Sequence, residues 1–320
     1  MRALVTGGSG FIGSEVVRQL LAAGHDVRIF SRRKNSAAQF GGKVEVVLGN
    51  LENPQSLTGA LDETDVLYHI GEIKNTSKAV AGRNVRVIEA LLKEPGRGKI
   101  KRIVFVSSIT VAGIPAAVPA TEDTPPRILV NDHYTDYKRR AEKLLGEAGG
   151  IEHVIIRPGF VYGPGSRHLG NLVGVINRLG PFGIPFPGSA SSIAPLIYVK
   201  DVSAAIFRAG IEPSAGGQIF NLTCGMRHTW LEFLESIAGQ LGKKLRIIPL
   251  PRLLLRLSAL PLDIASGFLG MRLDAVNYIE YFLSDLYFDN SKSRNLLHWQ
   301  PRYGLSEGVQ EMVESYSRQR

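Results

Sequence analysis

The sequence predicts an α/β fold in which a doubly wound parallel sheet is followed by a smaller C-terminal region. Short apolar runs alternate with segments of helical periodicity along the first half of the chain. The runs are apolar at nearly every position, which is typical of parallel strands that helices cover on both faces. A glycine-rich turn joins the first run to the first helical segment. Together these features indicate repeated β–α–β units around one sheet.

The expected elements can be placed in chain order. β-Branched and aromatic residues predict strands at residues 3–6, 27–30, 44–48, 66–70, 103–106 and 154–156. Apolar residues at helical spacing predict helices at residues 11–23, 85–92, 134–148 and 305–316, with a further helical segment around Leu57. Gly24 ends the first of these helices, as glycine commonly does.

The composition of the chain changes after Pro158. Glycine and proline are frequent in the stretch that follows, and regular alternation returns at residues 197–210 and 219–222. We therefore expect a dinucleotide-binding domain over residues 1–160 and a substrate-binding region over residues 161–320. Some of the later elements are expected to return to the main sheet.

The composition also narrows the class of protein. With 320 residues, 44% hydrophobic and 21% charged, the chain can bury a sizeable core. Its net charge of +9 comes from scattered basic residues. The densest basic cluster, at Arg97, Lys99, Lys101 and Arg102, is expected to be a solvated loop, so no nucleic-acid partner is predicted. The single Cys224 allows no internal disulfide and no His/Cys cluster has metal-ligand spacing, so we expect a cytoplasmic protein without a metal.

One apolar stretch, residues 253–269, has almost the composition of a membrane span. Arg256, Pro261 and Asp263 interrupt it, whereas a spanning helix needs about 20 mostly uncharged residues, so no membrane span is predicted. We expect a buried helix or a helix that covers a pocket. A contact with the membrane surface stays open as an alternative.

The turn after the first expected strand has the sequence TGGSGFIG. Its three spaced glycines permit a tight turn, close approach of a pyrophosphate and close packing of helix on strand. The helix N-terminus that follows offers free N–H groups to phosphates. A strand before and a helix after are the context that this motif requires, so we predict a Rossmann fold that binds a dinucleotide. The predicted contacts are Thr6, Gly7, Gly10, Phe11, Ile12 and Gly13.

The second expected strand ends in Ser31, Arg32 and Arg33, which are predicted to bind the adenosine end of the cofactor. An acidic residue here would accept hydrogen bonds from the ribose of NAD, whereas a guanidinium matches a 2′-phosphate in charge and shape. The two arginines therefore favour NADP(H), with NAD(H) left possible.

A tyrosine and a lysine four residues apart, Tyr134 and Lys138, begin an expected helix. The spacing places both on one helical face, where the ammonium group would bring the phenol pKa down toward working pH. The phenol could then exchange a proton with a carbonyl oxygen while a hydride moves. Ser107 and Ser108 follow the fifth expected strand, at the sheet edge where ligands bind, and a serine there can hydrogen-bond the same oxygen.

With these motifs the chain resembles the extended short-chain dehydrogenases/reductases over nearly its whole length. TGGSGFIG looks like the cofactor fingerprint of that family, and Tyr134 and Lys138 look like its catalytic pair. Within VSSITVAG the resemblance assigns the catalytic hydroxyl to Ser108, and RPGFVYGP resembles the segment that passes the nicotinamide. The resemblance also implies a homodimer. Further cofactor contacts are expected in these two motifs at Ser107, Pro158, Gly159 and Val161.

The chain departs from the family pattern at two places. Asn50 stands where the family usually has an aspartate that contacts the adenine, and the amide of an asparagine can still form a hydrogen bond there. After the fourth expected strand the usual small residues are replaced by Gly71 and Glu72. The resemblance gives no role to Glu72. The cofactor contacts that it implies at these two places are Asn50, Leu51, Ile70 and Gly71.

The resemblance also narrows the reaction. Ile109 and Thr110 follow Ser108, so the Asp–Glu pair of the family's sugar-nucleotide dehydratases is missing. Residues 189–197 lack the arginine with which nucleotide-sugar epimerases bind a diphosphate. The chain is instead similar to the 3β-hydroxysteroid dehydrogenase and dihydroflavonol reductase branch, which implies a small hydrophobic carbonyl or alcohol substrate. Two alternatives stay open: a nucleotide-sugar epimerase with tightly bound NAD, and a non-catalytic dinucleotide-binding sensor.

Overall fold

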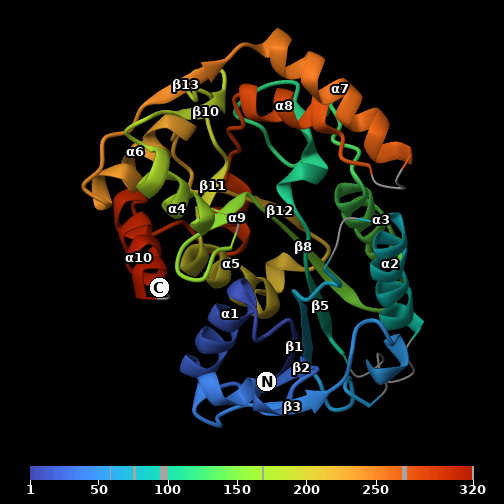
Figure 1. Ribbon diagram of the computed structural model, residues 1–320. Coiled ribbons are helices and arrows are strands. Elements are labelled where there is room, and N and C mark those ends of the chain that lie inside the picture. The colour runs from blue at the N-terminus through green and yellow to red at the C-terminus, as the bar shows by residue number, and fades with distance from the viewer. Residues whose placement is uncertain (58, 75–76, 94–99, 168, 269–271, 319–320) are drawn as a thin grey trace.

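The computed structural model describes residues 1–57, 59–74, 77–93, 100–167, 169–268 and 272–318. Its centre is a seven-stranded parallel sheet with the strand order β12-β8-β5-β4-β1-β2-β3 (Figure 1). The strands of this sheet are β1 (Arg2–Thr6), β2 (Asp26–Ser31), β3 (Glu45–Leu48), β4 (Val66–His69), β5 (Arg102–Val106), β8 (Glu152–Pro158) and β12 (Ile219–Leu222). The helices on its faces are α1 (Phe11–Ala22), α2 (Lys78–Lys93), α3 (His133–Glu147) and α5 (Val199–Ile211). The remaining elements, with 3-10 turns written as η, are η1 (Lys34–Phe40), η2 (Pro54–Leu57), η4 (Ile109–Ala112), β6 (Ile114–Pro115), β7 (Pro126–Ile128), β9 (Phe160–Tyr162), α4 (Gly170–Leu179), β10 (Ile184–Pro187), β11 (Leu196–Tyr198), η5 (Pro213–Ala215), α6 (Trp230–Gln240), β13 (Ile247–Leu250), α7 (Arg252–Phe268), α8 (Ala275–Leu283), α9 (Ser291–Leu296) and α10 (Leu305–Arg318).

Helices cover both faces of the sheet, so the predicted doubly wound α/β fold is confirmed. On one face α1 and α5 pack together and share a core with Ala3 and Val5 of β1. On the other face α2 and α3 pack together, and their apolar side chains join a core that contains Leu4. Successive side chains of a strand point to opposite faces, which is why neighbouring residues of β1 enter different cores.

The order of the strands reverses between β1 and β4. From β1 the chain moves outward through β2 to β3, then returns to β4 and continues through β5 to β8. Ligands of such sheets bind at the carboxyl ends of the strands, where the order reverses. The turn after β1 and the residues after β4 and β5 therefore meet at the edge where a ligand is expected.

The second half of the chain builds a smaller region and also returns to the main sheet. β12 pairs with β8 at one edge of that sheet, across the boundary expected near residue 160. Two small parallel pairs, β9 with β11 and β10 with β13, lie among α4, α6 and α10 (Figure 1). Their core contains the aromatic side chains of Tyr162, Trp230 and Phe233.

The expectation for residues 253–269 was wrong in one respect. These residues form α7, up to position 269, which lies outside the described residues, but the helix is not buried, and that it covers a pocket stays a prediction. Leu253, Leu254 and Leu257 are each more than half exposed, because α7 packs on α8 through its opposite face. Among the described helices none is long and apolar enough to cross a membrane.

The basic cluster before β5 is only partly a solvated loop. Arg97 and Lys99 lie outside the described residues, and Lys101 pairs on the surface with Asp65 at 3.0 Å. Arg102 is only 7% exposed, contrary to the expectation. Its guanidinium is held by the Glu152 carboxylate at 2.7 Å and by two main-chain carbonyl groups, so it joins β5 to the end of α5. The helical segment expected around Leu57 is the single turn η2.

Candidate active site

The glycine-rich turn between β1 and α1 has the shape that a phosphate site requires. Gly7 adopts a φ of 70°, and its carbonyl oxygen accepts a hydrogen bond from the N–H of Gly10 at 2.8 Å. A Cβ atom at Gly13 would lie 2.2 Å from that same oxygen, so only glycine lets the helix start this close to the turn. Gly10 caps α1 without a side-chain hydrogen bond, which leaves the first N–H groups of the helix, near Phe11 and Ile12, to a ligand.

The end of β4 packs directly against this turn. The N–H of Gly71 donates to the Thr6 main-chain oxygen at 3.0 Å and to the Thr6 hydroxyl at 3.1 Å. A Cβ atom at Gly71 would lie 2.8 Å from the nitrogen of Gly7, so any larger residue at this position would collide with the glycine-rich turn. Ile70 packs partly buried beside the core. His69 is buried and hydrogen-bonded to the Thr6 hydroxyl at 2.9 Å; burial and the nearby Lys138 charge lower its pKa to about 3, so it is a neutral structural residue.

The ends of β2 and β3 carry the residues expected at the adenosine end. The Ser31 hydroxyl shares a hydrogen bond with Ser36 at 2.6 Å. Arg32 and Arg33 are exposed, and neither guanidinium pairs with another residue in the described part of the chain. Asn50 uses its side-chain oxygen to accept the Glu52 N–H at 3.1 Å. Leu51 follows it, half-buried against the core on the α2 side of the sheet.

The three predicted catalytic residues come together at the ends of β5 and α3. The Lys138 ammonium group lies 5.5 Å from the centre of the Tyr134 ring and donates to the Val106 carbonyl at 2.8 Å. Ser108 lies within hydrogen-bonding reach of Tyr134, and this contact lowers the phenol pKa. The Ser108 oxygen also bonds the Thr110 hydroxyl at 2.9 Å and accepts the Thr110 N–H at 3.3 Å.

The pKa of Tyr134 differs from the expectation. Burial raises it well above its ordinary value, and the Glu72 carboxylate raises it further. Lys138 and Ser108 lower it, but by less than burial raises it. The phenol therefore keeps its proton at neutral pH in this structure, whereas the sequence had suggested a pKa near working pH.

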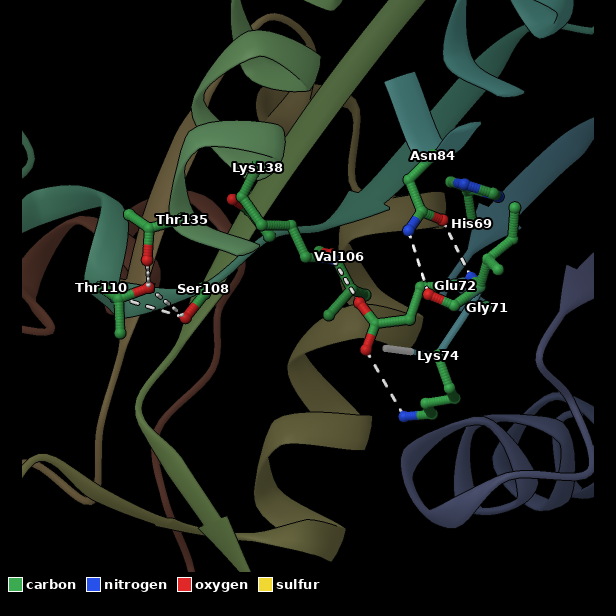
Figure 2. A network of polar contacts seen from close by, with 12 residues as sticks. His69, Gly71, Glu72, Lys74, Asn84, Val106, Ser108, Thr110, Thr135 and Lys138 are labelled. Carbon is green, nitrogen blue, oxygen red and sulfur yellow. Dashed lines mark hydrogen bonds and ion pairs between the residues drawn. The ribbon is translucent and has the colours of Figure 1, made fainter. Parts of the chain in front are cut away.

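Glu72 is the residue of this site whose role sequence reasoning left open. Its carboxylate lies 3.3 Å from the Lys138 ammonium group and 3.4 Å from that of Lys74 (Figure 2). Burial alone would raise the pKa of Glu72, but the two lysines hold it below its ordinary value, so the carboxylate is charged. Ile73, the residue after Glu72, is held by the side chain of Asn84. The Asn84 amide accepts the Ile73 N–H at 2.8 Å and donates to the Ile73 carbonyl at 3.0 Å. The sequence signal for this role is a carboxylate shortly after β4, where the strand order reverses and a ligand is expected.

A chain of hydrogen bonds runs from the Ser108–Thr110 pair to the C-terminal half of the molecule. The Thr135 hydroxyl donates to Thr110 at 3.0 Å and lies 2.9 Å from the Asp132 carboxylate (Figure 2 shows the Thr135–Thr110 contact). The Tyr278 hydroxyl, on α8, donates to Asp132 at 2.7 Å. Asp132 also caps α3, so the position of Ser108 depends on where α3 and α8 meet.

Ser107 is engaged within the protein, and its predicted cofactor contact stays a prediction. Its buried hydroxyl donates to the Glu142 carboxylate at 2.5 Å, and Arg157 holds the same carboxylate. The Ser107 side chain therefore ties β5 to α3 and β8, and its hydroxyl oxygen can still accept a hydrogen bond. Beyond Pro158, the N–H of Gly159 donates to Leu222 of β12 at 2.9 Å. Val161 follows in β9, half-buried.

Comparison with known proteins identifies the family. A model of the NAD dependent epimerase/dehydratase family matches residues 3–223. The chain belongs to this family. Its assignment to the extended short-chain dehydrogenases/reductases is thereby confirmed, and the protein is an NAD(P)-dependent enzyme of that class.

Relatives of this family member differ in their activities. The UDP-glucose 4-epimerase of Mycolicibacterium smegmatis is 28% identical, with 99% of this chain and 98% of the relative covered. The 3-beta-hydroxysteroid dehydrogenase of Mycolicibacterium neoaurum is 26% identical, with 99% and 91% covered. The solved structure of UDP-glucuronic acid 4-epimerase from Bacillus cereus, in complex with UDP-glucuronic acid and NAD, has a TM-score of 0.76 at 19% identity over the whole of both chains. This last similarity concerns the fold.

Proposed function

We propose that the protein is an NADP(H)-dependent oxidoreductase that interconverts a ketone and a secondary alcohol on a hydrophobic small molecule. The observation that carries the proposal is the meeting of Ser108, Tyr134 and Lys138 at the carboxyl edge of the sheet, next to the end of β4. A sensor that only binds a dinucleotide would not need a buried phenol beside an ammonium group.

The residues present fit a bound NADP(H). The glycine turn leaves the first N–H groups of α1 to a pyrophosphate, and only a glycine at position 13 lets α1 start this close to the turn. Arg32 and Arg33 are exposed cations without partners among the described residues, and they suit a 2′-phosphate. When bound, the nicotinamide supplies or accepts the hydride. The solved epimerase structure, which is 19% identical, contains NAD. The proposal that this protein prefers NADP(H) therefore rests on Arg32 and Arg33.

The protein's own residues would handle the proton. The Tyr134 phenol is protonated at neutral pH, because burial keeps its pKa from falling below the ordinary value, so it can donate to the oxygen of a ketone as the carbon is reduced. The Ser108 hydroxyl, fixed by Thr110, would hold that oxygen. Lys138 offsets the negative charge that Tyr134 gains, and Glu72 balances the charge of Lys138. A protonated phenol is the form that ketone reduction requires.

The surroundings of residues 189–197 favour an uncharged substrate. The N–H of Ile193 is bound to the Asp285 carboxylate at 2.9 Å, so this segment faces an anion instead of a cation. A diphosphate carries negative charge that must be paired when it leaves water. Phe160 stacks on Phe282 with ring centres 6.0 Å apart, and Trp230 lies 5.2 Å from the same Phe282 ring. Trp230 belongs to the buried core, whereas Phe160 and Phe282 are only partly buried and would offer an apolar ligand a contact surface.

A nucleotide-sugar epimerase is the second candidate, because the M. smegmatis relative carries that name. Such an enzyme would need a cation for the diphosphate. Arg227 lies over the Tyr287 ring at 4.8 Å, and Arg167 and Arg272 are exposed, so these three are the candidates. These three arginines lie in separate segments of the chain. None of them lies within residues 189–197, where the family's nucleotide-sugar epimerases have the arginine that binds the diphosphate.

Two measurements separate these candidates. Oxidation of NADPH, followed by absorbance across a panel of hydrophobic ketones, should reveal turnover if the first proposal is correct. Calorimetric titration with UDP and with UDP-glucose should show no micromolar binding. Micromolar binding of either nucleotide, with NAD retained through purification, would replace the reductase proposal with the epimerase.

A further inference from the structure

The outer face of α7 is strongly apolar and uncovered. Leu253, Leu257, Leu260 and Ile264 are 68%, 61%, 56% and 57% exposed. Their spacings of four, three and four residues place them along one side of the helix. Leu254, next to this line, is 61% exposed. Scattered apolar residues are ordinary on a protein surface, but five on one helical face form a patch that fits a partner.

The opposite face of α7 fixes this orientation. Arg252 and Arg256 donate to the buried Glu280 carboxylate of α8 at 2.9 and 2.7 Å. Asp263 accepts the N–H groups of Ala275 and Val276, at the start of α8, at 2.7 and 3.1 Å. These charged contacts hold α7 on α8, so the helix cannot turn its leucines inward without breaking them. Figure 1 shows α7 along the outer edge of the molecule, beyond α8.

The chain around α7 is strongly basic. Residues 241–272 contain six lysines and arginines and a single acidic residue, Asp263. Lys243, Lys244 and Arg246 precede β13, are exposed, and form no ion pair within the described residues. Of the apolar residues before α7, Phe182 is 77% exposed and Ile248 is 40% exposed. Gly183 connects these two, because a Cβ atom there would touch Ile248.

We propose that the outer face of α7 lies in the surface of a lipid bilayer that carries anionic headgroups. An amphipathic helix of this kind buries its apolar side at the level of the headgroups, and the net charge of +9 attracts the protein to anionic lipid. A second copy of the chain would be a poorer partner, because each copy carries a net charge of +9 and the two copies would repel each other. The proposal concerns docking and does not depend on the proposed reaction.

Vesicle sedimentation tests the proposal directly. The full-length protein should sediment with vesicles of phosphatidylcholine mixed with phosphatidylglycerol, less with phosphatidylcholine alone, and less as salt is raised. The variant Leu253→Ser/Leu257→Ser should bind about 10-fold or more weakly, since two leucines no longer leave water. Reversing charge with Lys243→Glu/Lys244→Glu should weaken the preference for anionic vesicles, because the net charge falls.

Matched measurements keep the test decisive. Ile211→Ser, at an exposed position at the end of α5, should bind vesicles like the unchanged protein. All variants should keep the same far-ultraviolet circular dichroism and thermal midpoint, because the changed side chains are exposed. Failure of the unchanged protein to bind either vesicle overturns the proposal. A dimer that becomes a monomer in Leu253→Ser/Leu257→Ser, without vesicle binding, would assign this face to self-association instead.

Discussion

The ion pair between Glu72 and Lys138 leads to a prediction about the pH dependence of ketone reduction. Glu72→Gln removes a negative charge while it keeps the shape of the side chain. The Glu72 carboxylate raises the pKa of Tyr134, after burial, so its removal should lower that pKa. Tyr134 must hold its proton to reduce a ketone. The rate should therefore fall at a lower pH in the variant than in the unchanged enzyme.

The size of this effect follows from the geometry. Glu72 lies 3.3 Å from the Lys138 ammonium group, which lies 5.5 Å from the Tyr134 ring centre. The carboxylate is thus at most about 9 Å from that ring, where two charges interact by roughly 0.5 to 2 kcal/mol at effective dielectric constants of about 80 and 20. We expect the alkaline limb to move down by about 0.5 to 1 pH unit, allowing for partial screening.

The assay is the pH profile of kcat/KM for NADPH-dependent reduction of the best ketone found in the panel. Glu147→Gln provides the matched control, because it makes the same change at an exposed end of α3 beside Lys143. Its profile should be unchanged. An alkaline limb that stays in place or moves upward in Glu72→Gln, in a folded variant, would refute the assignment of Glu72 to the electrostatics of Tyr134.

Three further predictions concern the phenol, the cofactor and the fold. Tyr134→Phe should lower turnover by about 100-fold or more while NADPH still binds, as fluorescence titration would report; near-normal turnover would remove Tyr134 from the proton transfer. Arg32→Ala/Arg33→Ala should weaken NADP(H) by about 2–4 kcal/mol and leave NAD(H) almost unchanged, and tighter binding of NAD(H) than NADP(H) by the unchanged protein would contradict this. Gly71→Ala should lower the free energy of unfolding by about 1–3 kcal/mol in urea, because its Cβ atom would press on Gly7; unchanged stability would show that the two segments can separate.

Local sequence patterns predicted the dinucleotide-binding fold and much of the candidate site. The glycines of TGGSGFIG act through the turn that they themselves form, and Tyr134 and Lys138 lie on one helix, so their spacing fixes their common face. The apolar strands required helices on both sides, which the structure confirms. The return of β12 to the sheet was expected only in general terms, because pairing partners are chosen by the whole fold.

Contacts between distant segments were decided only by the tertiary structure. Glu72 follows β4 and Lys138 belongs to α3, and the sequence of neither segment predicts that the two side chains form an ion pair. Ser107 and Ser108 are adjacent in sequence, but the strand turns one hydroxyl toward Glu142 and the other toward Thr110. The pKa of Tyr134 likewise depends on burial, which the Tyr–Lys spacing does not contain.

The helix at residues 253–269 illustrates the same division. Its sequence by itself determined an amphipathic helix that cannot span a bilayer, because charged residues and a proline interrupt the apolar stretch. Which face is covered was decided by α8, whose buried Glu280 binds Arg252 and Arg256. Periodicity defines the faces of a helix, but only the neighbour that packs against it determines which face meets the solvent.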